Sequence, residues 1–367
     1  MLENWLRPLS DELLDFRNKL PEESFGKKIR IWGTEGTDIA PNSLVLLGIQ
    51  EPGSEKVRKE LYALSAPPNG IHLIDLGNAR KQDPEFMIPL LKELFESKVC
   101  TVLISSDPKY LQAQFQAQQN LQRPVSLSVI DERIGDPVQK SKGKNYLEEL
   151  LKKPHPNLFH FSILGLQSHL TAPSLLRNLE KRYFELFRLG NLRSDITQSE
   201  PYLRDADLVG FQIRALRQSE APGVSQASPS GLFAEEACQM ARYAGMSDKL
   251  RAFGIFGFRP DLDRRRQTAQ LTAHLIWYFT DGFGNRKQDF PISTEGLVEY
   301  IVDYKTLDLH LTFWKSARSG RWWLQVPEPP PQEMKRHWLI PCSYLDYTLA
   351  SNGELPPRLV QALKRFK

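Results

Sequence analysis

Three charged side chains at the ends of two apolar segments are the first candidates for chemistry. VSLSVIDERIGDP (125–137) carries Asp131 and Arg133 after a β-branched run, and GFQIRAL (210–216) carries Arg214 after another apolar run. A carboxylate in such a place is a common metal ligand or acid–base group, whereas an arginine has no lone pair to offer a metal. The residue types therefore favour an Asp–Arg ion pair in a polar cavity or a site that binds an anion.

Both segments belong to an alternation of short apolar runs and stretches with helical periodicity. Seven such units, beginning with SLVLLGI (43–49), extend to about residue 283. Apolar strands that alternate with helices are typical of a parallel sheet covered on both faces, although a barrel is also compatible. Ligands of an open parallel sheet gather at the carboxyl ends of its strands. The candidate strand-end segments are Ser105–Lys109, Asp131–Asp136, Gly165–His169, Gln212–Arg217 and Gly257–Asp263.

Length, composition and charge exclude several classes of protein. The chain has 367 residues, of which 41% are hydrophobic and 25% charged, as is ordinary for a globular protein. A net charge of +4 is too small to argue for nucleic acid or an anionic membrane as partner. The three separated cysteines fit buried thiols in a reducing compartment, and no run approaches the roughly 18 apolar residues of a membrane span. These features predict a cytoplasmic protein.

The last 80 residues follow a different pattern. DLHLTFWKSARSGRWWLQVP (308–327) reads as two strands around a turn and predicts an antiparallel β-hairpin. Because adjacent residues of a strand face opposite sides, one of Trp322 and Trp323 is expected to pack on the body and the other to serve a partner contact. The predicted division of the chain is an N-terminal helical segment (1–40), an α/β domain (41–290) and a C-terminal hairpin extension packed on it (291–367).

The content and order of these segments resemble the arginase/agmatinase/formimidoylglutamase superfamily of ureohydrolases, from about residue 43 to 283. ISSDPKYLQAQF stands where the family has Gly-Gly-x-His, VIDERIGD where it has Asp-x-His-x-Asp, and GFQIRAL where it has Ser-Phe-Asp-x-Asp. EEACQMARYAGMSDKL looks like the formimidoylglutamase branch. The resemblance implies a three-layer α/β fold, with a mainly parallel sheet of about eight strands between helices, and a hydrolase of linear amidines or guanidines.

The resemblance also implies where a two-manganese centre would lie. The family builds this centre from two histidines and four aspartates. The six corresponding positions of this chain hold Pro108, Asp131, Arg133, Gly135, Gln212 and Arg214. One ligand of six is therefore retained, while Glu236 matches the substrate-side glutamate of the family.

The substitutions reverse the charge of the centre. Side chains alternate along a strand, so residues 131, 133 and 135 are expected to face one side, and residues 212 and 214 likewise. Asp131 with Arg133 and Arg214 carries a formal +1, where the four carboxylates of the family carry −4. One arginine about 4 Å from a divalent ion costs roughly 8 kcal/mol at an effective dielectric of about 20. This cost cancels a micromolar affinity, worth about 8 kcal/mol, and predicts no metal cofactor.

Two functional hypotheses remain. The first is a non-catalytic member of the ureohydrolase superfamily, a pseudoenzyme, that binds an unknown protein partner or a small anion. Its ligand-binding candidates are Asp131, Arg133, Arg214 and Glu236. The second is a C–N hydrolase of the formimidoylglutamase, agmatinase or arginase type with a displaced or single manganese site. At least two of His155, His160 and His169 would have to converge with Asp131 to form a single-metal site. A homo-oligomer is compatible with both hypotheses.

Overall fold

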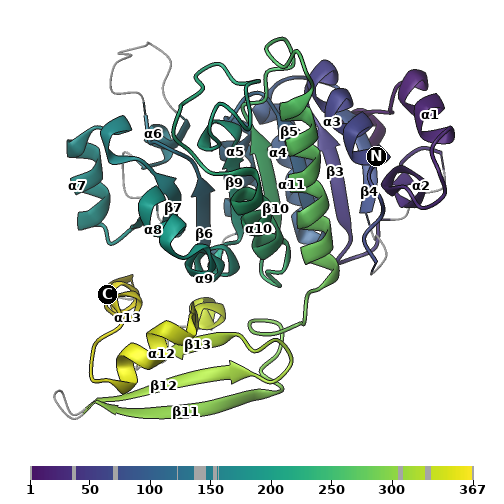
Figure 1. Ribbon diagram of the computed structural model, residues 1–367. Coiled ribbons are helices and arrows are strands. Elements are labelled where there is room, and N and C mark those ends of the chain that lie inside the picture. The colour runs from purple at the N-terminus through teal and green to yellow at the C-terminus, as the bar shows by residue number, and fades with distance from the viewer. Residues whose placement is uncertain are drawn as a thin grey trace.

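Two β-sheets make up the core of the protein. The computed structural model describes residues 2–34, 39–68, 73–121, 123–135, 146–151, 155, 157–304, 309–326 and 332–365. A ten-stranded, mostly parallel sheet carries helices on both faces, and a four-stranded antiparallel sheet near the C-terminus lies beside one end of its strands (Figure 1). The predicted α/β fold is confirmed, and the large sheet is open rather than closed into a barrel.

The large sheet has β1 at one edge and β8 at the other, and only β1 runs antiparallel to its neighbour. The apolar runs of the sequence form its centre because these strands are buried on both faces. In spatial order the strands are β1 (Leu6–Arg7), β4 (Leu73–Ala79), β3 (Leu44–Gly48), β5 (Cys100–Ser105), β10 (Ala252–Phe256), β9 (Leu208–Gln212), β6 (Val125–Ile130), β7 (Leu158–Leu166) and β8 (Glu185–Arg188), with β2 (Arg30–Ile31) on β4.

Helices cover the two faces of this sheet and enclose two separate apolar clusters. Along β3, Leu44 and Leu46 belong to one cluster, while Val45 and Leu47 belong to the other. The first cluster receives α1 (Asp11–Asn18), α2 (Phe25–Lys28), α3 (Glu51–Ala63), α8 (Leu189–Ser194), α9 (Glu200–Asp205), α10 (Ala234–Gly245) and α11 (Gln267–Gly284). The second receives α4 (Pro84–Glu96), α5 (Tyr110–Gln119), α6 (Tyr146–Leu151) and α7 (Pro173–Lys181). The result is the expected three-layer arrangement.

The N-terminal segment is not only helical. Besides α1 and α2, it contributes β1 and β2, which both pair with β4 and raise the strand number from the expected eight to ten. Each of these strands has two residues, too few to produce a period-two pattern in the sequence. The boundaries proposed at residues 40 and 290 stay a prediction.

The C-terminal extension contains more than the predicted hairpin. β12 (Leu309–Ser316) and β13 (Trp322–Gln325) form that hairpin, but β11 (Leu297–Tyr304) and β14 (Leu339–Cys342) flank it in an antiparallel sheet. The helices α12 (Tyr344–Ser351) and α13 (Pro357–Arg365) complete the extension. An apolar cluster between this sheet and its two helices includes side chains from both, so the extension has a core of its own.

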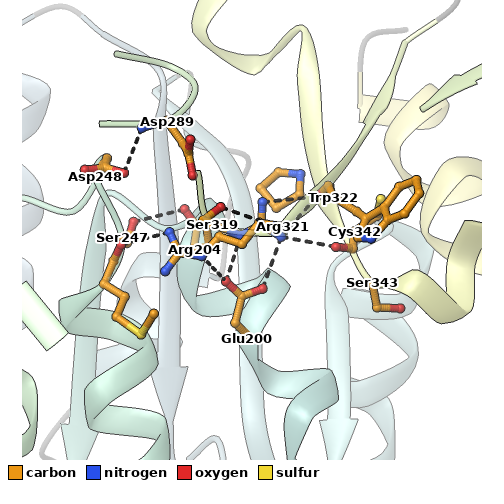
Figure 2. A network of polar contacts seen from close by, with 12 residues as sticks. Glu200, Arg204, Ser247, Asp248, Asp289, Ser319, Arg321, Trp322, Cys342 and Ser343 are labelled. Carbon is orange, nitrogen blue, oxygen red and sulfur yellow. Dashed lines mark hydrogen bonds and ion pairs between the residues drawn. The ribbon is translucent and has the colours of Figure 1, made fainter. Parts of the chain in front are cut away.

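A buried arginine connects this extension to the large sheet domain (Figure 2). Arg204 of α9 binds the Glu200 carboxylate through Nε (2.8 Å) and Nη2 (3.1 Å). Its guanidinium also donates to the carbonyl oxygens of Trp322 on β13 and Cys342 on β14. Arg321 lies on the other side of Glu200, with its Nε 3.3 Å from Oε1. One carboxylate and two strand carbonyls thus share the charge of a side chain that is only 4% exposed.

The two tryptophans of β13 face opposite sides of the small sheet, and both are buried. Trp322 stacks on Tyr347 of α12 with ring centroids 4.8 Å apart. Trp323 lies under Arg204, whose guanidinium carbon is 4.4 Å from the ring centroid. Trp323 thus packs on the large domain, as expected for one of the pair. The expectation that the other serves an external partner is wrong, because α12 of the extension covers Trp322.

Two findings bear on cysteine chemistry and membrane insertion. Cys100, Cys238 and Cys342 are all free and buried, as their spacing predicted. Within the described ranges, the chain has no helix with the length and apolar character needed to cross a bilayer.

We expect Arg204→Ala to destabilise the protein by about 3 kcal/mol, because two strand carbonyls lose a buried donor and Glu200 loses the closer of its two arginine partners. Urea unfolding followed by tryptophan fluorescence measures this loss. Arg318→Ala is the matched control, since Arg318 pairs with the largely exposed Glu295 in the same extension and should cost at most about 1 kcal/mol. Equal losses in the two variants would show that the Arg204 network does not hold the extension in place.

Candidate functional site

A cavity of about 390 Å³ lies at the carboxyl ends of the central strands. Three of the predicted strand-end segments meet there, namely those that follow β5, β9 and β10, which are neighbours in the sheet. Its walls consist of Ser106, Asp107, Pro108, Gln212, Arg214, Val224, Ser225, Gln226, Gly257 and Arg259. The sheet topology therefore brings together residues more than 100 positions apart in the sequence, as expected for an open parallel sheet.

The central contact of this site is an ion pair between Asp131 and Arg214. Asp131 follows β6 directly and is fully buried. Arg214 lies just beyond β9, and its Nε and Nη2 donate to Oδ1 and Oδ2 of Asp131 at 2.9 and 2.7 Å. The hydroxyl of Tyr146 donates to the same Oδ2 at 3.1 Å. Two parallel N–H···O bonds of this kind are the strongest geometry that an arginine and a carboxylate form.

Burial and the charge of Asp131 determine the protonation of its two partners, Arg214 and Tyr146. Burial lowers the pKa of Arg214, but the Asp131 carboxylate outweighs burial, and the net pKa lies above the usual value. Burial and then the Asp131 charge raise the pKa of Tyr146 well above its ordinary value. Arg214 therefore stays charged, and the Tyr146 hydroxyl keeps the proton that it donates.

Arg133 does not join this pair, contrary to the alternation expected from the sequence. β6 ends at Ile130, so the backbone of residues 131–135 no longer alternates as a strand does. Arg133 Nε lies 3.3 Å from Oε1 of Glu132, and Nη2 donates to Oε1 of Gln226 at 2.5 Å. Asp131 thus neutralises Arg214, and the adjacent Glu132 is the counter-ion of Arg133.

The other predicted positions are only partly gathered at the cavity. Pro108 and Gln212 line it, and the amide nitrogen of the buried Gln212 lacks a hydrogen-bond partner among the described residues. Gly135 is buried with φ +78°, a left-handed conformation that favours glycine over a ligand-bearing residue. Glu236 is not part of the cavity wall: its Oε2 accepts from the Phe233 amide at the start of α10. Glu236 therefore has a capping role.

The residues at the six positions do not fit a pair of divalent cations. Proline, glycine and arginine offer no side-chain lone pair, and the amide oxygen of Gln212 is a weak donor. Both oxygens of Asp131 already accept hydrogen bonds from Arg214 and Tyr146. Across the described part of the chain, no three His, Cys, Asp or Glu side chains cluster as metal ligands.

The comparisons with known proteins agree with this architecture. A family model described as the Arginase family matches residues 146–281. A manganese-bound structure of Trypanosoma cruzi formiminoglutamase superimposes with a TM-score of 0.60 at 15% identity, covering 70% of this chain and 97% of that one. The chain has the fold of the arginase (ureohydrolase) superfamily. No curated protein sequence matches it.

Two further solved structures share this ureohydrolase fold. Formimidoylglutamase from Bacillus subtilis gives a TM-score of 0.61 at 18% identity, covering 71% of this chain and 92% of that one. Agmatine ureohydrolase of Thermoplasma volcanium gives 0.55 at 16% identity, covering 73% and 97%. Identities this low establish the fold and leave the chemistry of this ureohydrolase-fold chain to its own residues.

Sequence reasoning missed three residues around the six predicted ligand positions, namely Glu132, Tyr146 and Gln226. Tyr146 and Gln226 reach the site from segments with no recognisable motif. The role of Glu132 does not follow from the sequence, because the alternation rule assigns Arg133 to Asp131 as an ion-pair partner. Only Tyr146 carried a usable signal, because it opens an apolar helix shortly after the strand that ends before Asp131.

We expect Arg214→Met to destabilise this ureohydrolase fold by about 3–5 kcal/mol, because a buried carboxylate loses its counter-ion. Adding Asp131→Asn should recover part of that loss, since no uncompensated charge is then left. Urea unfolding of the two single variants and the double variant measures the coupling. Arg259→Met, which removes a pair with Asp261 that is about half exposed, should cost no more than about 1 kcal/mol. If the losses of the two single variants simply add up in the double variant, Asp131 and Arg214 do not stabilise each other.

Glu132 should make stability depend on pH. Burial raises the pKa of Glu132 to about 7, although Arg133 opposes the change. Because its usual value is 4.5, the folded state binds this proton more tightly, so the stabilisation is complete below pH 4.5 and is lost as the pH rises through 7. Between pH 4.5 and pH 7, the free energy of unfolding of wild type should fall by on the order of 2 kcal/mol relative to that of Glu132→Gln, as measured by urea unfolding. A difference in unfolding free energy that does not change with pH would contradict the raised pKa of Glu132. Glu22→Gln, at an exposed site, is the control.

Proposed function

We propose that this protein is a non-catalytic member of the ureohydrolase superfamily, whose former metal centre is now an ion pair. The observation that supports this proposal is the bidentate contact between Arg214 and Asp131. Arg214 supplies the positive charge that two metal ions would otherwise bring to this buried carboxylate. The same guanidinium would repel a divalent cation by roughly 8 kcal/mol at about 4 Å and an effective dielectric of about 20.

The geometry favours a structural role for these arginines over anion binding between them. Arg214 uses Nε and Nη2 on Asp131, and Arg133 uses Nε and Nη2 on Glu132 and Gln226. An anion at this place would compete with carboxylates that are already held. We therefore propose that the protein acts by binding a partner elsewhere on its surface, and its cytoplasmic location and oligomeric state stay predictions.

The alternative is a metal-dependent C–N hydrolase with a displaced or single manganese site. Its support is the fold, which it shares with a manganese-bound formiminoglutamase. It needs ligands other than the six former positions. His160, one of the histidines considered for this purpose, instead lies 2.7 Å from the Glu185 carboxylate in a buried contact between β7 and β8. Asp136, a further carboxylate near the site, lies outside the described residues.

Metal content separates the two functions. After dialysis into manganese and then into metal-free buffer, we expect wild type to retain far less than one ion per chain, because five of the six ligand positions hold proline, arginine, glycine or glutamine. Elemental analysis measures the retained manganese, and assays with formimidoylglutamate, agmatine and arginine should detect no hydrolysis. Retention of about two ions with hydrolysis would refute the non-catalytic proposal. One ion that is lost in Asp131→Asn would instead support the single-metal alternative.

A gain-of-binding variant provides the matched control for that experiment. Gln212→Asp combined with Arg214→Asp restores two carboxylates beside Asp131 and changes the formal charge of these three positions from 0 to −3. We expect this variant to retain more manganese than wild type under identical dialysis. If it retains no more, the charge of the cavity is not what excludes the metal.

A further inference from the structure

Basic residues also gather at the opposite edge of the large sheet, where the parallel strands begin. Lys98 lies two residues before β5, Arg251 directly before β10, and Arg123 two residues before β6. These strands lie close together in the sheet, in the order β5, β10, β9, β6. Because the amino ends of parallel strands meet at one edge, three cationic side chains that are far apart in the sequence become neighbours.

A cleft of about 540 Å³ lies over these residues. Arg336 of the C-terminal extension, on the 3-10 helix Gln332–His337, forms part of its wall, as do Pro291 and Ile292. The four-stranded sheet lies on this side of the molecule, so the extension completes the cleft (Figure 1). Its volume is in the range of pockets for small molecules.

Not all the cations of this cleft have counter-ions. Lys249 is held by Asp205, with Nζ 3.2 Å from Oδ1, and Arg336 contacts Asp207. Lys98, Arg123 and Arg251, in contrast, have no carboxylate partner in the described part of the chain. The Arg251 guanidinium donates from Nη1 to the Lys98 carbonyl oxygen at 3.1 Å. Three positive charges of the cleft are therefore unbalanced.

The two carboxylates that line the cleft are occupied by other groups. Glu96 faces Lys92 one helical turn away, at 3.6 Å. Asp248 accepts hydrogen bonds from the backbone amides of Gln288 and Asp289 at 3.1 and 3.2 Å. Neither carboxylate forms an ion pair with the three unbalanced cations.

The guanidinium groups are close enough to influence one another. Burial, and then the charge of Arg123, lowers the pKa of Arg336 to about 10. Burial also lowers the pKa of Arg251, and Arg123 lowers it further. An anion in the cleft would relieve this repulsion between the guanidinium groups.

We propose that this cleft binds a small molecule with a multiply charged phosphate group. Guanidinium groups match phosphate oxygens in charge and planar geometry, and three or more cations suit a group that carries more than one negative charge. Phe95, Leu121 and Ile292 also line the cleft and offer apolar contacts to the organic part of such a ligand. This inference does not rest on the proposed function, because the two sites lie at opposite edges of the sheet.

Calorimetric titration of the full chain with inorganic pyrophosphate at low ionic strength tests the proposal. Wild type should bind, and Arg123→Ala and Arg251→Ala should each raise the Kd at least about tenfold, which is the effect of losing one charge-assisted contact. Arg123 is exposed, so its replacement tests the site without disturbing the core. Arg265→Ala, at an exposed arginine just before α11, is the control and should leave the Kd unchanged.

Several outcomes would overturn the proposal. They are no binding of pyrophosphate by wild type, equal Kd values in wild type and both cleft variants, or an equal loss in Arg265→Ala. Citrate tests whether phosphate chemistry matters, since binding as tight as that of pyrophosphate would assign the cleft to anions in general. A single-stranded oligonucleotide that binds more tightly, and loses affinity in the same two variants, would assign it to nucleic acid instead.

Discussion

A buried carboxylate needs a positive partner, and the identity of the partner at Asp131 determines what this fold can do. Both oxygens of Asp131 are used, by two N–H groups of Arg214 and by the Tyr146 hydroxyl. A metal ion would have to displace donors that are already desolvated and well aligned. The ion pair and a metal centre are thus mutually exclusive at this position, and the contacts favour the ion pair.

The parallel sheet determines where such groups meet. Its carboxyl edge collects the segments after β5, β9 and β10, and its amino edge collects the residues before β5, β10 and β6. The C-terminal extension contributes to the amino edge, through the contacts of Arg204 with β13 and β14 and through Arg336. One topology therefore creates two polar sites of different composition, and the extension supplies part of the wall of the cleft at the amino edge.

Much of this arrangement could be predicted from the sequence, because buried strands leave continuous apolar runs. The two-residue strands β1 and β2 left no such signal, and β11 and β14 were missed beside a hairpin that was recognised. At the site, the proximity of Asp131 and Arg214 followed from the resemblance. The prediction that Arg133 faces Asp131 was wrong, because it applied the strand alternation beyond Ile130, where β6 ends. The contact of Tyr146 with Asp131 depends on tertiary packing, and its one sequence signal was the apolar helix that Tyr146 opens.

The two edges differ in how their arginines are neutralised, and this difference indicates which edge is available to a ligand. Arg214 has a buried carboxylate, so its charge is already compensated within the fold. Arg123 and Arg251 have no carboxylate partner in the described structure, and the charge of Arg123 lowers the pKa of Arg251. A fold tolerates such a cluster at a cost in stability, because desolvated like charges oppose compaction. Anion binding would offset that cost, whereas at the Asp131–Arg214 pair an anion would only displace an existing partner.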